Sequence, residues 1–208
     1  MQKKNILLIS TKGLTGLSAD KIRIRYFRQV LEISGYNFVI FEINLSGFRK
    51  YLLYFLRSPP KELEERAKDA DLIMTTSPSL ISAILGYRIA EKLGKPLIAD
   101  VRDIWEEYAK AAHSLAYRIG VIPRIIKDYY KALSYSSKII TATEFMKQYY
   151  ERKLGIRGEK IILISNGTDV DLIMPSEEIK REIDAVCLAD LNQPYHNLEF
   201  LFNALKLE

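Results

Sequence analysis

The sequence predicts an α/β fold with a doubly wound parallel sheet. Short runs rich in isoleucine, leucine and valine alternate along the chain with longer segments of helical periodicity. The runs are apolar throughout, which is typical of strands covered by helices on both faces. The chain has 208 residues, of which 48% are hydrophobic and 27% charged, so it can bury a core and is not expected to be disordered.

The predicted strands are residues 5–10, 37–43, 71–76, 96–101, 137–142 and 160–165. Between the first two, four apolar residues recur at helical spacing: Ile22, Tyr26, Val30 and Ile33. This spacing predicts a helix that packs these four side chains on the sheet and stops at Gly35. Further helices are predicted from residue 78 to Gly94, over 127–135 and over 144–154. Alternating strands and helices require right-handed crossovers, which build a parallel sheet.

The pattern changes after Gly167, where a domain boundary is predicted. Residues 1–167 form the first domain, and the polar residues 168–182 are expected to be a linker. Beyond the linker, residues 183–208 contain one strand candidate, 183–188, and one helix candidate, 197–205. We therefore expect them to be an incomplete start of a second domain.

Composition excludes several classes of protein. Cys187 is the single cysteine, so an intramolecular disulfide is impossible, and with two histidines the chain cannot assemble a Cys/His zinc site. The first apolar run is too short for a signal peptide, and no run approaches the ~20 apolar residues of a membrane span. We expect a cytoplasmic protein. The net charge of +5 is modest and its basic residues are spread among acids, which disfavours nucleic-acid binding.

Ligands of open parallel sheets bind beyond the carboxyl ends of the strands, so the loops found there are candidate sites. Asp100, Arg102, Asp103 and Trp105 end or follow the fourth predicted strand. A carboxylate there, Asp103 or Asp100, can accept the proton of a hydroxyl, and an arginine can hold that carboxylate or bind a phosphate. The alternative is structural: Asp103 caps a helix and Arg102 pairs with Asp100.

Two other loops carry weaker signals. Gly13 and Gly16 follow the first strand, where backbone N–H groups and a helix N-terminus can approach an anion, although two glycines also suit an ordinary tight turn. The next helix has a basic stripe that includes Arg25, which either contacts phosphate or is simply solvated. Asn166 and Gly167 follow the last strand and predict a turn that either borders the site or only reverses the chain.

Residues 46–58 are dense in aromatic and basic side chains and contain no acid. A helix of this composition can lie on a membrane with its apolar side in the headgroup region. The alternative is a helix packed on the sheet, because Phe48, Leu52 and Phe55 have the spacing of a core-facing stripe. The sequence leaves both interpretations open.

Five stretches in register resemble the N-terminal half of the GT-B glycosyltransferases of family 4. They are the glycine loop 13–16 with the basic helix after it, DLIMTTSP (71–78), GKPLIADVRDIW (94–105), residues 137–146 and GEKIILISNGTD (158–169). The third is similar to GKPLVxDxRDLW and the last to EKIxVIPNGVD of that family. The resemblance implies a Rossmann-like, acceptor-binding first domain, a donor-binding second domain, and transfer of a hexosyl or amino-sugar group without a metal or other cofactor.

By position, the resemblance places Gly13 and Gly16 near the donor phosphates and Asp103 or Asp100 at the acceptor hydroxyl. It makes substrate contacts of Arg102, Trp105 and Arg25. It places Asn166 and Gly167 at the border of the cleft. The implied partners are a nucleotide sugar as co-substrate and a glycan or lipid-linked acceptor.

The chain also departs from the family pattern. The positions of the diphosphate-binding groups read Ala189, Asp190, His196 and Asn197. These cannot neutralise a diphosphate, so the chain is expected to be inactive without a donor domain supplied in cis or in trans. Two alternatives stay open: a non-catalytic module that docks onto a separate donor subunit, and a sugar-nucleotide epimerase of the same fold.

Overall fold

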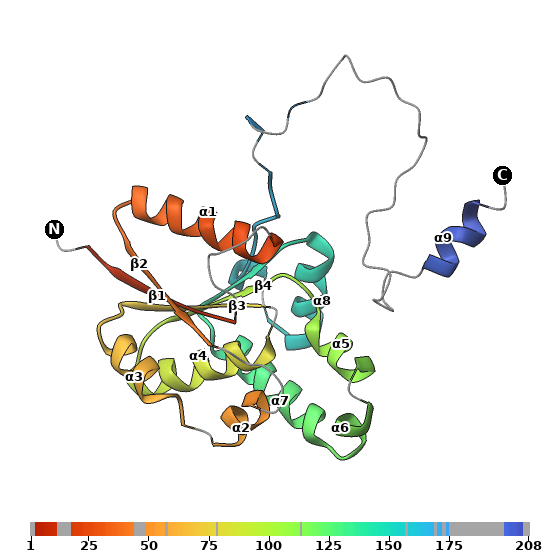
Figure 1. The fold of residues 1–208 in the computed structure, drawn as a ribbon, viewed down its shortest axis with the longest axis horizontal. Helices are drawn as coiled ribbons and strands as arrows, with labels where there is room; N and C mark the ends of the chain where they lie inside the picture. Colours follow the sequence, from red (N-terminus) through yellow and green to blue (C-terminus); the bar gives the residue numbers. More distant parts are fainter. Residues whose placement is uncertain are drawn as a thin grey trace. The chain divides into compact units, whose positions relative to one another are not determined.

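The computed structural model describes residues 3–11, 18–43, 49–56, 58–77, 79–112, 114–156, 158–168, 170–171, 174 and 198–205. Within them, six parallel strands form one sheet in the order β2-β1-β3-β4-β5-β6 (Figure 1). The strands are β1 Asn5–Ser10, β2 Asn37–Glu42, β3 Leu72–Thr76, β4 Leu97–Val101, β5 Lys138–Thr141 and β6 Ile161–Leu163. The predicted α/β class with a Rossmann-like parallel sheet is confirmed.

The helices of the first part of the chain follow the strands. They are α1 Ala19–Ile33, α2 Arg49–Phe55, α3 Lys61–Lys68, α4 Leu80–Leu93, α5 Trp105–Ala112, α6 Ser114–Arg118, α7 Val121–Tyr135 and α8 Glu144–Leu154, with a short 3₁₀ turn, η1, at Gly158–Lys160. Side-chain caps define two of them: Ser79 accepts a bond from the Ile81 amide at the start of α4, and Thr143 accepts one from Met146 at the start of α8.

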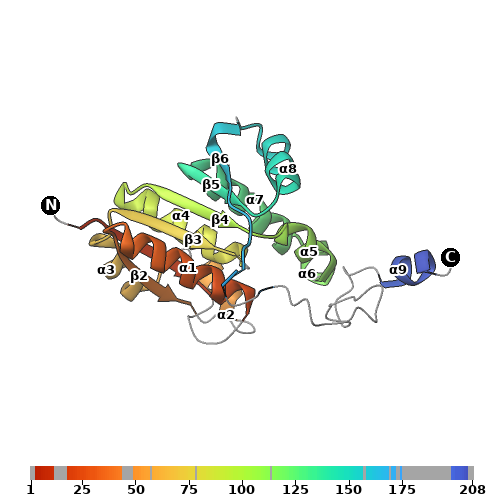
Figure 2. The same ribbon diagram turned by 90° about the horizontal axis from the view of Figure 1, so that it is seen from above.

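Helices cover the two faces of the sheet unequally. In Figure 1, α1 lies on one face, and α2, α3, α4 and α7 lie on the other. The larger core includes Leu7, Ile73 and Leu85, whereas the smaller core joins Ile6 and Leu8 to residues of α1. Figure 2 shows that α1 lies over the side of β1, β2 and β3, while β5 and β6 lie at the other edge beside α8.

The prediction for the buried side of α1 is wrong. Tyr26, Val30 and Ile33 are 41%, 59% and 80% exposed. The residues of α1 that pack on the sheet are Ile24, Phe27 and Leu31. The helix is rotated in this way because Arg23 is buried and its guanidinium is bonded to Asp100 at the end of β4.

The chain divides into two units, Met1–Gly167 and Thr168–Glu208. In the second unit, α9 spans Leu198–Leu205, where the sequence predicts a helix. The expected linker lies largely, and the expected strand 183–188 wholly, outside the described residues. None of the helices in the described ranges is both long enough and apolar enough to span a membrane.

Candidate functional site

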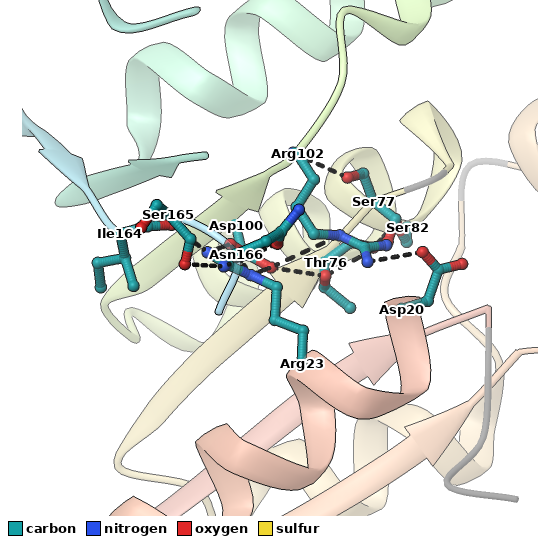
Figure 3. A network of polar contacts seen from close by, with 10 residues as sticks. All are labelled: Asp20, Arg23, Thr76, Ser77, Ser82, Asp100, Arg102, Ile164, Ser165 and Asn166. Carbon is teal, nitrogen blue, oxygen red and sulfur yellow. Dashed lines mark hydrogen bonds and ion pairs between the residues drawn. The ribbon is translucent and has the colours of Figure 1, made fainter. Parts of the chain in front are cut away.

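The order of the strands places a topological switch point at the carboxyl edge of the sheet. The chain moves from β1 outward to β2 and then returns to β3 on the other side of β1, so the direction of winding reverses between β1 and β3. Open α/β sheets bind ligands at such a switch point. In this structure a polar network fills the same edge and joins α1, β3, β4 and the segment after β6 (Figure 3).

Arg23 and Asp100 form the centre of this network. The Nε atom of Arg23 donates to both carboxylate oxygens of Asp100 at 3.2 Å, and Nη2 donates to Oδ1 at 2.9 Å. Thr76 Oγ1 donates to the other oxygen, Oδ2, at 2.8 Å. The side chains of Arg23 and Asp100 are 8% and 0% exposed. Protein groups therefore enclose the Asp100 carboxylate on both oxygens.

Arg23 also holds the segment that follows β6. Its Nη2 donates to the carbonyl oxygen of Ile164 at 2.9 Å, and its Nη1 donates to the carbonyl oxygen of Ser165 at 3.1 Å and to Asn166 Oδ1 at 3.3 Å. One buried guanidinium thus ties the start of α1 to the end of the first unit. Gly167, the next residue, is exposed.

Arg102 points into the network. Its Nη1 lies 2.6 Å from Asp20 Oδ1, its Nη2 donates to the carbonyl oxygen of Ser77, and its Nε lies 4.0 Å from Asp100 Oδ2. The backbone amide of Arg102 donates to Ser77 Oγ at 3.0 Å. These bonds link the first turn of α1 to the ends of β3 and β4, so this guanidinium acts as a structural brace.

Asp103 is the exposed carboxylate next to this brace. Partial desolvation raises the pKa of the Asp103 carboxyl above its ordinary value; Arg102 opposes this rise and Asp20 adds to it. A carboxylate with a raised pKa accepts a proton more readily than an ordinary aspartate. The geometry therefore offers a proton acceptor that solvent and ligands can reach.

Trp105 begins α5, two residues after Asp103, and is half-buried. Its ring packs edge-on against Tyr108, with centroids 5.2 Å apart. It lines a small cavity with Thr76, Asp100 and Tyr129 that leaves about 10 Å³ for the centre of a water molecule. Trp105 Nε1 has no hydrogen-bond partner among the described residues, and the cavity has room for about one water.

Sequence reasoning brings together only part of this site. Asp100, Arg102, Asp103 and Asn166 all lie at the carboxyl edge, but the α1 residue in the network is Arg23 rather than the exposed Arg25. Gly13 and Gly16 lie outside the described residues. Arg23 was missed because an arginine on a basic helix is ordinarily assigned to the surface. Thr76 and Ser77 lie in the DLIMTTSP stretch, but that motif gave neither of them a role, and Asp20 belongs to no motif. Across the described ranges, no group of three or more histidine, cysteine or acidic side chains could hold a metal.

The comparison with protein families agrees with the resemblance seen in the motifs. The profile of Glycosyltransferase Family 4 matches residues 17–172, which is most of the chain. No curated protein matches the chain at a significant level. Crystal structures of HepE from Anabaena are similar: the complex with UDP has 18% identity and a TM-score of 0.46 and aligns over 81% of this chain and 45% of HepE. The complex with UDP-glucose has 17% identity and a TM-score of 0.48, over 83% and 46%.

The chain thus spans less than half the length of the HepE chains to which it is similar. The family profile begins next to α1 and ends past β6, so it covers every residue of the polar network and the exposed Asp103. The chain belongs to glycosyltransferase family 4.

Proposed function

We propose that the first unit is the acceptor-binding half of a nucleotide-sugar-dependent glycosyltransferase. Together with a donor domain in cis or in trans, this half transfers a hexosyl group to a hydroxyl of a lipid-linked or polysaccharide acceptor; alone, it is inactive. The observation that carries this proposal is the exposed Asp103 carboxylate, which has a raised pKa and lies beside a rigid buried network at the ligand edge of the sheet.

In the proposed reaction, Asp103 orients the acceptor hydroxyl and accepts its proton. The acceptor oxygen forms a bond to the anomeric carbon, the bond from that carbon to the diphosphate breaks, and the nucleoside diphosphate leaves with the bonding electrons. The half-buried ring of Trp105 offers an apolar surface on which a sugar ring can pack.

Asp100 and Arg102 have positioning roles in this proposal. The Asp100 carboxylate is bonded on both oxygens to Arg23 and Thr76, and Arg102 is bonded to Asp20 and Ser77. They hold the ends of β3 and β4 on which the Asp103 turn rests. Contact with the donor phosphates is assigned, by family resemblance, to the loop with Gly13 and Gly16, and the remaining donor contacts to a second domain in cis or in trans.

The experiment is a transfer assay on the protein produced from its complete reading frame. A panel of nucleotide sugars is offered with a lipid and polysaccharide extract, and nucleoside diphosphate release and labelled sugar in the product are both measured. We expect one donor to support transfer and Asp103→Asn to abolish most of it. If the protein binds a separate donor subunit but neither component alone nor the complex consumes any donor, the unit is a non-catalytic module and the proposal is wrong.

The exposed side of α2 supports a peripheral membrane contact as part of the same proposal. Tyr54 is buried and its hydroxyl donates to Asp128 Oδ2 at 2.8 Å, which fixes the rotation of the helix. Leu52, Phe55 and Leu56 are consequently 48%, 51% and 59% exposed. Leu52 and Phe55 therefore do not form the core-facing stripe considered above, and Phe48 lies outside the described residues. Apolar side chains in a segment rich in bases are suited to an anionic membrane surface.

Vesicle flotation tests this contact. Vesicles containing phosphatidylglycerol should carry the wild-type protein, and Phe55→Glu/Leu56→Glu should remain unbound. The matched control is Ile33→Glu, which changes an 80% exposed residue of α1 on the other face of the sheet and should float like the wild type. Equal flotation of both variants would remove α2 from the membrane contact.

A further inference from the structure

A buried carboxylate lies next to the proposed site but takes no part in the reaction described above. Glu106, the second residue of α5, is 0% exposed. Each of its oxygens accepts a bond from a tyrosine on a different helix: Tyr130 Oη of α7 donates to Oε1 at 3.3 Å, and Tyr150 Oη of α8 donates to Oε2 at 3.1 Å. One side chain therefore joins the start of α5 to two longer helices.

Further tyrosines extend this cluster. The hydroxyl groups of Tyr129 and Tyr150 lie 3.5 Å apart, as do those of Tyr130 and Tyr149. Tyr149 Oη also donates to Glu107 Oε1 at 2.9 Å. We call Glu106, Glu107 and these four residues the tyrosine cluster. Because Tyr129 also lines the small cavity beside Trp105, the cluster reaches the underside of the proposed site.

A carboxylate is a costly group to bury here. Among the described residues, the side chains that bond to it are neutral phenols, and no lysine or arginine lies within ion-pair distance of it. Burial raises the pKa of the Glu106 carboxyl, and its own backbone amide and the phenols of Tyr150 and Tyr130 oppose part of that rise. An apolar side chain would avoid this cost, but it could not accept two hydrogen bonds of fixed direction.

The first turn of α5 depends on such contacts. The helix has only eight residues, and helices of this length are not stable in water without tertiary packing. Trp105 precedes Glu106 directly, and Asp103 lies one turn earlier in the chain. A short stretch of backbone therefore joins the Glu106 anchor to both residues.

We propose that Glu106 is a positioning residue, which, on the proposed function, holds Asp103 and Trp105 in place through its bonds to Tyr130 and Tyr150. The tyrosine cluster acts as the fixed support, and the α5 start is the part that it positions. Displacement of a reacting group by about 1 Å can lower turnover about 100-fold, so this role has a kinetic signature.

The first arm of the test does not need activity. Trp105 is the single tryptophan, so fluorescence excited at wavelengths that tyrosine does not absorb reports on the α5 start alone. Glu106→Ala should shift the emission to the red and increase quenching by acrylamide, and Glu106→Gln, which keeps the shape and one accepting oxygen, should restore much of the wild-type signal. The control is Glu91→Gln, which alters another tyrosine-bonded glutamate, 2.5 Å from Tyr87 Oη on α4, and should leave the signal unchanged.

The second arm uses the complete protein and its donor and acceptor. Glu106→Ala should lower kcat roughly 10-fold or more while the Kd for the nucleotide stays within about twofold, since Glu106 acts on the acceptor side only. If Glu106→Ala does not fold, Tyr130→Phe/Tyr150→Phe keeps both rings and replaces it in both arms. Unchanged Trp105 fluorescence in a folded variant overturns the positioning role even if the protein is not a transferase, and altered fluorescence with unchanged kcat overturns its importance for the reaction.

Discussion

Removal of the Asp100 carboxylate is expected to destabilise the first unit severely. Its side chain is 0% exposed, and it accepts bonds from Arg23 Nη2 at 2.9 Å and from Thr76 Oγ1 at 2.8 Å. Asp100→Ala leaves the Arg23 guanidinium buried without its counter-charge, which costs about 3–5 kcal/mol in comparable pairs. A domain of this size loses roughly 2–4 °C in Tm per kcal/mol, so Tm should fall by about 6–20 °C.

Urea unfolding followed by far-UV circular dichroism measures this change in the free energy of unfolding. The matched control is Arg28→Ala, on the same helix, which removes an exposed pair with Glu32 at 2.8 Å and should cost less than about 1 kcal/mol. Asp100→Ala/Arg23→Met removes both charges and should recover part of the loss. A cost for Asp100→Ala no larger than that of the control would refute the structural reading of the network.

Two further predictions concern stability. Burial raises the pKa of the Glu106 carboxyl above its ordinary value of 4.5, so the folded state binds this proton more tightly than the unfolded state. The stability that this tighter binding gives the folded state is present at low pH and is lost as pH rises through the raised pKa. Tm of the wild type should therefore fall relative to Glu106→Gln as pH rises above the ordinary pKa of 4.5, and parallel Tm profiles would contradict this. Gly86→Ala adds a methyl group that collides with the Thr75 methyl. Overpacking costs about 1–3 kcal/mol, which should outweigh the gain of about 1 kcal/mol in helix propensity, so the urea midpoint should fall. An unchanged midpoint would show that α4 can shift to make room.

The strands were predictable because their residues are apolar on both faces. Each of the six strands predicted in the first unit is present, and its ends differ from the prediction by no more than one or two residues. Helix α7 begins at Val121 rather than at residue 127, because Pro123 falls in its first turn, where a proline N–H is not needed. Helix α3 was missed because it is mostly charged and buries only Leu63 and Ala67.

The rotation of α1 could not be read from periodicity alone. Two apolar stripes share this helix, and the one that contains Tyr26 and Val30 looks as suitable for a core as the one that packs on the sheet. The choice between them depends on Arg23, whose burial is stabilised only by groups distant in sequence, such as Asp100 and the carbonyl of Ile164. A carboxylate that ends an apolar strand was the one available signal that a buried cation lies opposite.

The most direct test of the central claim is the kinetic behaviour of Asp103→Asn in the complete protein. If Asp103 accepts the proton of the acceptor hydroxyl, kcat should fall by about 100-fold or more, while the Kd for the nucleotide sugar should stay within about twofold of the wild type. A variant that turns over at the wild-type rate, or that loses donor affinity in the same proportion as kcat, would show that this carboxylate supports the fold rather than the chemistry.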